Sequence, residues 1–425
     1  MRLGDQLKLA GQLAGALRSQ WWSRDRIRAF QGAALVEMMR YAVVHVPYYR
    51  RLGLPAEDLR RAEDLQRFPL IRKRDLQEEP AAFLAEGHDP AGVHASRTSG
   101  SSGQPTTTYF DRESWLLMRY ALKMRRVVAT SGVPLLRRVL IVSEQPEEQL
   151  AALERAAPGR LGLFYSLRYV SIHTPAEQHI DEFERYRPQV IYAFPSYLLD
   201  LVDRAERLRR PLPRIPVLST SSEVLTAAAR RRIEAAFRGR LFDVYGSTEF
   251  KEVAWQCRSG RYHLNFESVY VERPAAGRSG PLVLSTLCNR AMPLLRFDVG
   301  DAAFFGGERC ACGRESLCLD QITGRESEMI DLPSGRRLSP YLLTTAIEAS
   351  DLVRTYRIVQ TSADAFRVDV VLAGPPAPGW QGHLCTELTR IVAEPARFTV
   401  RLVDAIERAP GGKRAAFVRA DCAAH

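Results

Sequence analysis

Residues 96 to 109 form a polar stretch rich in hydroxyl groups and glycine, a composition suited to binding phosphate. Gly100 and Gly103 permit backbone angles that let N–H groups approach a ligand closely. The hydroxyl groups around them can hold polyphosphate oxygens and belong to Ser99, Ser101, Ser102, Thr106 and Thr107. The stretch is not a Walker loop, because Gln104 and Pro105 follow the second glycine where that motif requires lysine. The alternative is a flexible linker.

Residues of types that bind metal ions occur in two pairs farther along the chain, Cys257 with His263 and Cys310 with Cys312. Three cysteines and one histidine are a common ligand set for structural zinc. Cys318 is a reserve ligand. Four protein ligands leave no open coordination position, so a zinc ion held by them would be structural rather than catalytic. The alternative is that these thiols simply pack in the core.

Lysine is scarce in this arginine-rich chain and occurs only at positions 8, 73, 123, 251 and 413. Lys413 ends a Pro-Gly-Gly-Lys segment near the C-terminus. A compact ammonium on a flexible stem can do what a planar guanidinium does less well, so its retention suggests a specific role. The alternative is a solvated lysine on a C-terminal hairpin.

The elements that must position these residues alternate between short strands and helices. Five runs are predicted to be strands, at residues 139–142, 190–193, 217–220, 241–244 and 282–285. Amphipathic helices are predicted between them, at residues 177–186, 197–208 and 226–237. This alternation indicates an α/β fold with mainly parallel strands, in which ligands gather at the C-terminal ends of the strands.

The chain is predicted to form two domains: a large multi-layer α/β domain over residues 1–326 and a small, mobile α+β domain over residues 327–425. Residues 1–70 are predicted to be a mainly helical extension, interrupted at Trp21 and Trp22. Its first helix is expected to cover the domain; the alternative is that it lies on a membrane or a partner. The small domain is expected to contain helices near 341–348 and 383–392 and strands near 356–360, 366–371 and 398–403.

The composition is that of an ordinary globular protein, with 46% hydrophobic and 26% charged residues among 425. The net charge of +11 is scattered and forms no basic block interleaved with aromatic residues, so nucleic acid is not expected as a partner. No run approaches the roughly 18 apolar residues of a membrane span, and the N-terminal residues do not resemble a signal peptide. A cytoplasmic location is therefore expected. The seven cysteines favour metal binding or core packing over disulfides.

In order and separation, four segments resemble the adenylate-forming superfamily of acyl-CoA synthetases, adenylation domains and luciferase. They are the loop at 99–106, the Tyr-Gly-Ser-Thr-Glu run at 245–249, Asp301, and the Gly-Gly-Lys tail. Residues 41–50 and 220–225, together with the cysteine-containing segments, are similar to the phenylacetate-CoA ligase family. Within it they fall especially close to the branch associated with capsular polysaccharide and deazaflavin coenzyme synthesis. The resemblance runs from about residue 35 to the end.

This resemblance implies roles for particular residues. Glu249 would hold Mg²⁺, Thr248 would hydrogen-bond the α-phosphate of ATP, and Lys413 would be the catalytic cation. The remaining residues implied to bind ATP or AMP are Ser99, Gly100, Ser101, Ser102, Gly103, Thr106, Ser222, Glu223, Asp243, Tyr245, Gly246, Ser247, Asp301 and Arg325. Tyr192 and Phe194 follow a predicted strand and are candidates for the acid pocket; equally, they are candidates for the core.

The implied activity is that of an AMP-forming ligase. It would activate a carboxylic acid, expected to be aromatic, with ATP and Mg²⁺ and pass the acyl group to coenzyme A. The small domain would rotate between the half-reactions about a hinge near Ser327, where the family has an aspartate. One alternative keeps the adenylation without coenzyme A, in polysaccharide or natural-product assembly. A second is a non-catalytic, zinc-stabilised scaffold that binds nucleotide. The acid, the acceptor and the oligomeric state, with a homodimer as one option, stay open.

Overall fold

The computed structural model describes residues 3–97, 106–132, 137–143, 145, 149–150, 165–274, 277–307, 309–325, 330–338, 340–350, 352–406 and 416–420. The chain forms two compact units. The first comprises Met1–Leu135 with Phe242–Ile322, and the second comprises Leu136–Leu241 with Thr323–His425. The expected domain boundary at 326 falls in residues 326–329, outside the described residues, and stays a prediction.

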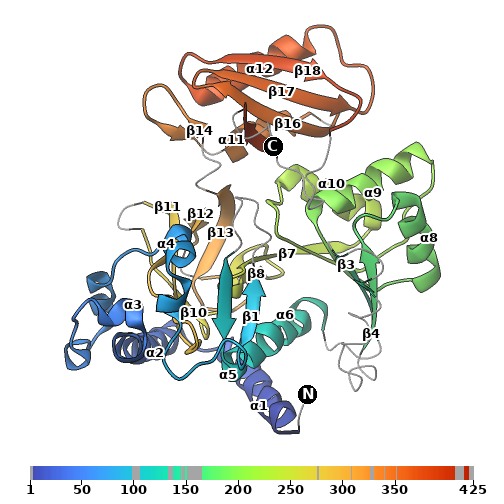
Figure 1. Ribbon diagram of the computed structural model, residues 1–425. Coiled ribbons are helices and arrows are strands. Elements are labelled where there is room, and N and C mark those ends of the chain that lie inside the picture. The colour runs from blue at the N-terminus through green and yellow to red at the C-terminus, as the bar shows by residue number, and fades with distance from the viewer. Residues whose placement is uncertain are drawn as a thin grey trace. The chain divides into compact units, whose positions relative to one another are not determined.

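The first unit begins with helices. Its helical elements are α1 (Leu3–Ser19), α2 (Arg24–His45), α3 (Pro47–Arg50), α4 (Lys73–Glu78), α5 (Arg112–Leu116), the π-helical turn η4 (Leu117–Ala121) and α6 (Leu122–Ser131), together with three short 3₁₀ turns, η1 (Ala56–Asp58), η2 (Ala62–Arg67) and η3 (Pro80–Phe83) (Figure 1). Helix α1 ends before Trp21 as predicted, and α2 begins after Ser23, whose hydroxyl accepts from the Arg26 N–H. Arg112 of α5 pairs with Asp5 of α1, which supports the covering role for α1.

The strands of the first unit are β1 (His94–Arg97), β2 (Thr107–Phe110), β7 (Arg240–Ser247), β8 (Lys251–Gln256), β9 (Tyr262–Leu264), β10 (Val269–Val271), β11 (Ser279–Thr286), β12 (Phe297–Phe305) and β13 (Cys318–Arg325). β1 and β2 form a separate hairpin, and the others are ordered β10-β11-β12-β13-β9-β8-β7. Strands β7, β8 and β9 pair antiparallel, as do β10, β11 and β12. The expectation of mainly parallel strands was therefore wrong for this unit, because short hairpin connections join neighbouring strands here.

The second unit contains the parallel part of the fold. Its elements up to residue 237 are β3 (Arg137–Ser143), β4 (Tyr165–Ser171), α8 (Ala176–Tyr186), β5 (Val190–Ala193), α9 (Pro195–Arg207), β6 (Val217–Ser221) and α10 (Ala227–Phe237). The strand order is β6-β5-β3-β4, and the pairs β3–β4, β3–β5 and β5–β6 are parallel. The predicted strands and helices of this region are confirmed. Their apolar side chains form one core, which includes Leu140, Ile191, Leu218 and Phe237.

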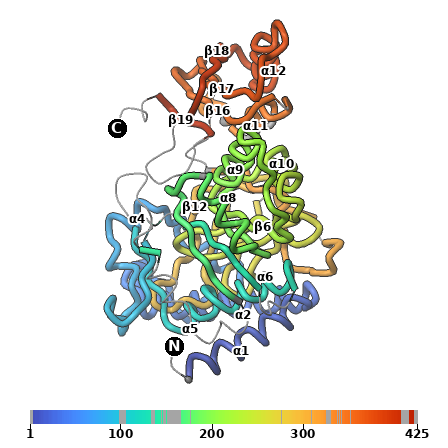
Figure 2. Tube along the Cα trace, turned by 90° about the vertical axis from the view of Figure 1, so that its right-hand side faces the viewer, coloured from blue at the N-terminus to red at the C-terminus, as the bar shows by residue number. Residues whose placement is uncertain are grey.

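The C-terminal part of the second unit has a core of its own, including Ile358, Val368 and Leu388. Its elements are β14 (Ile330–Asp331), β15 (Arg337–Leu338), α11 (Pro340–Ile347), β16 (Val353–Ser362), β17 (Ala365–Leu372), α12 (Trp380–Val392), β18 (Arg397–Leu402) and β19 (Phe417–Arg419). The sheet order is β18-β17-β16-β19, and α12 lies beside it in both views (Figures 1 and 2). The α+β pattern predicted for this segment is confirmed.

No helix among the described residues combines the length and the apolar character needed to cross a membrane.

Candidate functional site

The expected phosphate loop lies between β1 and β2. The two strands pair antiparallel, with Arg97 opposite Thr107, so the residues that flank the loop are held side by side. Thr106, the residue before β2, is buried. The other loop residues of the prediction, Ser99, Gly100, Ser101, Ser102 and Gly103, lie outside the described residues.

The Tyr-Gly-Ser-Thr-Glu run closes β7 and turns the chain into β8. Gly246 has to be glycine here, because a Cβ atom on it would lie 2.2 Å from the carbonyl oxygen of Lys251. The Ser247 hydroxyl accepts a hydrogen bond of 3.1 Å from the Phe250 N–H and closes the turn. Glu249 is buried immediately after Thr248. Strand pairing therefore fixes the position of a buried carboxylate at the end of β7.

Tyr245 and Asp301 come from two different motifs and meet in the structure. The Tyr245 hydroxyl donates to Oδ2 of Asp301 at 2.7 Å, and Asp301 lies on β12. The residue before it, Gly300, has a φ of +75°, a conformation that glycine adopts freely. Its N–H donates to Oδ1 of Asp298 at 2.9 Å. Two residues expected to bind ATP or AMP are thus neighbours.

Asp243 has a structural partner of its own. Its Oδ2 accepts from the Tyr262 hydroxyl at 2.6 Å, and its N–H donates to Oε1 of Gln256 at 3.0 Å. Asp243 is buried on β7. The implied nucleotide contact for Asp243 stays a prediction, and the carboxylate in this structure joins β7 to β9.

Two lysines near the motif have lowered pKa values. Burial is the largest cause for both: it lowers the pKa of Lys251 to about 7 and that of Lys123 to about 8. Arg119 lowers both pKa values further, while Glu249 raises that of Lys251 and Glu252 raises that of Lys123. No role was predicted for these lysines. Their one sequence signal was the scarcity of lysine, strengthened for Lys251 by its place two residues after the motif.

The residues expected from the second unit fall on β5, α9 and the segment after β6. Phe194 precedes α9 and packs in the core of the unit, while Tyr192 is half-buried on β5. Glu223 accepts hydrogen bonds from the N–H of Ser196 at 2.9 Å and from its hydroxyl at 2.8 Å, which satisfies the N-terminal end of α9. Ser222 has a φ of +73°, rare for a residue with a side chain.

Three residues with predicted roles in the C-terminal half lie at or beyond the limits of the described residues. Arg325 ends β13, and only its backbone is described. Lys413 and Ser327 lie outside the described residues. Their implied roles stay predictions.

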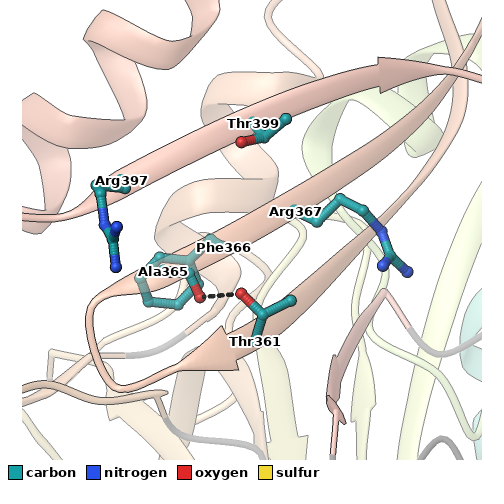
Figure 3. Close-up of a pocket in the computed structure, with 6 residues that line it drawn as sticks. All are labelled: Thr361, Ala365, Phe366, Arg367, Arg397 and Thr399. Atoms are coloured by element: carbon teal, nitrogen blue, oxygen red, sulfur yellow. Dashed lines mark hydrogen bonds between the residues drawn. The ribbon is translucent and has the colours of Figure 1, made fainter.

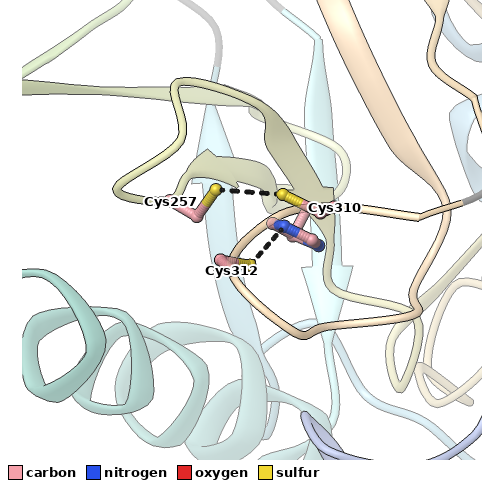
Figure 4. Close-up of side chains that lie close together, drawn as sticks. Cys257, Cys310 and Cys312 are labelled. Carbon is pink, nitrogen blue, oxygen red and sulfur yellow. Dashed lines mark hydrogen bonds between the residues drawn. The ribbon is translucent and has the colours of Figure 1, made fainter.

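The structure brings together the four residues predicted to bind zinc. The ligand atoms of Cys257, His263, Cys310 and Cys312 all lie within 4.8 Å of one another (Figure 4). Cys257 and Cys310 sulfurs are 3.6 Å apart, and the Cys312 sulfur is 3.2 Å from Nε2 of His263. Tetrahedral zinc, with bonds of about 2.3 Å to sulfur and about 2.1 Å to nitrogen, requires ligand separations of about 3.5 to 3.8 Å. The donor set therefore fits zinc in type. The sulfur–sulfur separation lies within this range, the sulfur–nitrogen separation is shorter, and no two ligand atoms are more than 4.8 Å apart.

Neighbouring residues orient His263 and influence the charge of Cys312. Nδ1 of His263 lies 2.9 Å from the Ser316 hydroxyl, so Nε2 is the nitrogen that faces the cluster. The Cys312 thiol has a lowered pKa because Cys257 hydrogen-bonds to it and His263 adds to the effect. Cys318, the reserve ligand, is not in the four-residue set; its thiol donates to the Ser316 carbonyl at 3.3 Å. Burial raises the pKa of Cys318 to about 12, which disfavours the thiolate.

A surface pocket on the C-terminal sheet contains none of the predicted site residues. It is lined by Thr361, Ala365, Phe366, Arg367, Arg397 and Thr399 (Figure 3), and the Thr361 hydroxyl donates to the Ala365 carbonyl at 3.2 Å.

The chain has the fold of the adenylate-forming ligases. Solved 2-hydroxyisobutyryl-CoA ligase in its postadenylation state matches with a TM-score of 0.78 at 21% identity, over 94% of this chain and 90% of that one. Anthranilate CoA ligase matches with a TM-score of 0.55 at 14% identity, over 77% of this chain and 67% of that one.

In sequence the chain is similar to phenylacetate-coenzyme A ligases, as predicted. The enzyme of Thermus thermophilus is 28% identical over 79% of this chain and 78% of its own length. The Escherichia coli enzyme is 25% identical over 72% and 73% of the respective chains. No protein-family model matches the chain.

Proposed function

We propose that the protein is an AMP-forming ligase that adenylates a carboxylic acid and transfers the acyl group to coenzyme A. The observation that carries the proposal is the 2.7 Å hydrogen bond between Tyr245 and Asp301, because it joins two separate motifs into one place for a nucleoside. The similarity to phenylacetate-coenzyme A ligases over most of both chains supports the thioester product.

Adenylation needs cations and hydrogen-bond donors more than a protein nucleophile. The acid carboxylate attacks the α-phosphorus of ATP and pyrophosphate leaves, so two anions must approach each other. Thr248 would donate to the α-phosphate, and the residues around Ser99 to Thr106 would donate to the phosphate chain. Lys413 would screen the repulsion between the acid and the α-phosphate. In the second half-reaction the coenzyme A thiol attacks the acyl carbon and AMP leaves.

Glu249 is the residue proposed to bind Mg²⁺. Its buried carboxylate lies next to Thr248 at a fixed turn, and carboxylate oxygen is a ligand that Mg²⁺ prefers. The metal would neutralise charge on the phosphates while pyrophosphate departs. Asp301, whose Oδ2 accepts from the Tyr245 hydroxyl, would accept from a ribose hydroxyl.

The acid is proposed to be aromatic on the strength of the relatives, which are named for phenylacetate. Tyr192 remains a candidate for the acid pocket because it is half-buried at the end of a parallel strand, where ligands of such sheets gather. Phe194 is the weaker candidate, since its ring packs in the core.

The Cys257, His263, Cys310 and Cys312 cluster is proposed to hold one structural zinc ion. With four protein ligands it leaves no position for a substrate, so its contribution is to fix the segment around Cys310 and Cys312 against β8 and β9.

Acid-dependent release of pyrophosphate from ATP tests the activity, with and without coenzyme A. We expect the enzyme to complete many turnovers only when coenzyme A is present. In a Lys413→Ala variant, the rate of adenylation should fall by orders of magnitude. The same variant should still form thioester from a supplied acyl-adenylate; equal loss in both steps would refute the role of Lys413. Pyrophosphate release that coenzyme A does not affect would favour transfer to another acceptor. Absence of release with every acid tested would favour the non-catalytic scaffold.

A further inference from the structure

Lys251 adopts a backbone conformation that residues with side chains rarely occupy. Its φ is +58°, in the left-handed region that favours glycine. It lies two residues after Glu249, at the turn that leads from the Tyr-Gly-Ser-Thr-Glu run into β8. Backbone strain of this kind persists where the surrounding structure enforces it, and it concentrates at functional sites. A lysine at this position is therefore expected to contribute through its side chain.

The Lys251 side chain reaches two aromatic rings. Its Nζ lies 4.5 Å from the ring centre of Phe110 on β2 and 5.4 Å from that of Trp115 on α5, distances at which a cation is attracted to an aromatic face. Nζ also donates to the carbonyl oxygen of Thr248 at 3.0 Å. The ammonium is thus fixed beside two aromatic rings and next to the turn that carries Thr248 and Glu249.

Positive charge exceeds negative charge around this ammonium. Arg119 and Lys123 both act on Lys251 electrostatically, and Glu249 is the acidic group that acts on it. Glu252 acts on Lys123, but its Oε2 is also ion-paired with a further cation, Arg126, at 3.0 Å. A partly enclosed excess of cations attracts an anionic ligand and is stabilised by one.

We propose that Lys251, with Arg119 and Lys123, binds a second anionic group on the acid substrate, so that the enzyme prefers an acid carrying a carboxylate besides the one it adenylates. This inference rests on the proposed function. The phosphates of ATP are the other source of anionic oxygen, and the proposed function assigns them to the residues around Ser99 to Thr106. Phe110 and Trp115 beside the ammonium suit the carbon skeleton of an organic acid better than a phosphate chain.

Matched acids that differ by one carboxylate test the proposal. The full-length protein is assayed for kcat/KM of pyrophosphate release with phenylacetate against 4-carboxyphenylacetate, and with pentanoate against glutarate. We expect the wild type to prefer the dicarboxylate of each pair. Lys251→Gly should lower the dicarboxylate-to-monocarboxylate ratio by about 10- to 100-fold, the range for loss of a hydrogen bond between charged groups. Glycine suits the φ of +58°, so this substitution also removes the backbone strain.

Two further variants make the result specific. Lys251→Arg keeps the charge and should keep most of the wild-type ratio, and Lys73→Met, at the start of α4 and outside the cluster, should leave the ratio unchanged. An unchanged ratio in Lys251→Gly would overturn the inference and leave the proposed function standing. A raised KM for ATP without a changed ratio would assign the anion to the nucleotide and overturn it as well. Absence of pyrophosphate release with every acid tested would overturn the proposed function and this inference with it.

Discussion

Replacing Lys123 by methionine should stabilise the protein at neutral pH. Burial and Arg119 lower the pKa of Lys123 from 10.5 to about 8 in the folded state. That difference corresponds to about 3 kcal/mol against the charged form, at about 1.4 kcal/mol for each tenfold change in the ionisation equilibrium. Because the side chain is only half-buried, we expect Lys123→Met to raise the free energy of unfolding by about 1 to 3 kcal/mol at pH 7.

The pH dependence has a definite sign. Below pH 8 the lysine is charged in both the folded and the unfolded state, so the full penalty is present. Between pH 8 and 10.5 the unfolded state binds more protons, and the stability of the wild type rises with pH relative to that of the variant. The advantage of Lys123→Met should therefore be largest at pH 7 and should shrink as the pH approaches 10.

Urea unfolding followed by tryptophan fluorescence measures this effect, with Trp115 and Trp255 as reporters in the first unit. Lys73→Met is the matched control and should change the free energy of unfolding by less than about 0.5 kcal/mol. A Lys123→Met protein that is no more stable than the wild type at pH 7, or whose advantage grows with pH, would refute the reasoning.

Three other substitutions test the turn, the nucleoside site and the metal cluster. Gly246→Ala places a Cβ atom 2.2 Å from the Lys251 carbonyl oxygen. We therefore expect the free energy of unfolding to fall by about 1 to 3 kcal/mol and adenylation to weaken. A variant that matches the wild type in melting temperature and adenylation would contradict the close approach. Tyr245→Phe keeps the ring and removes the hydrogen bond to Asp301, which should raise the KM for ATP about 10-fold; an unchanged KM would show that the bond does not order the nucleoside site. Elemental analysis should find zinc in the wild-type protein but not in the Cys310→Ser variant. The control variant Cys385→Ser changes a cysteine outside the cluster and should keep its zinc. A stable wild-type protein without zinc would refute the metal site.

Local patterns in the sequence predicted much of the fold. The alternation of apolar residues located β3, β5, β6 and helices α8 to α10, because each of these elements buries one face or both. Pairing direction was harder to predict. The run at 282–285 is a strand as expected, but β11 pairs antiparallel with β10 and β12. A strand's own residues do not specify its neighbour, since connection length and the rest of the sheet decide it.

The metal cluster was predictable because its residue types are distinctive even when the two pairs are distant in sequence. The structure brought Cys257, His263, Cys310 and Cys312 together and left Cys318 outside the set. The proposed role of Lys251 could not be predicted from the sequence, because it is inferred from a backbone angle and from contacts with other elements.

The roles assigned to Thr248, Glu249 and Lys413 came from resemblance and remain to be measured. So does the implied nucleotide contact of Glu223, whose carboxylate is engaged by the N-terminal end of α9. A helix that begins with unsatisfied N–H groups competes for a nearby carboxylate, and the sequence around Glu223 does not reveal that competition.

The most direct test of the central claim is acid-dependent pyrophosphate release from ATP by the purified full-length protein, over a panel of aryl, aliphatic and dicarboxylic acids, with and without coenzyme A. The proposed function predicts release with at least one acid, multiple turnovers only when coenzyme A is added, and AMP and acyl-CoA formed in equal amounts. Absence of release across the panel, or release that coenzyme A does not affect, would contradict an AMP-forming acid–coenzyme A ligase.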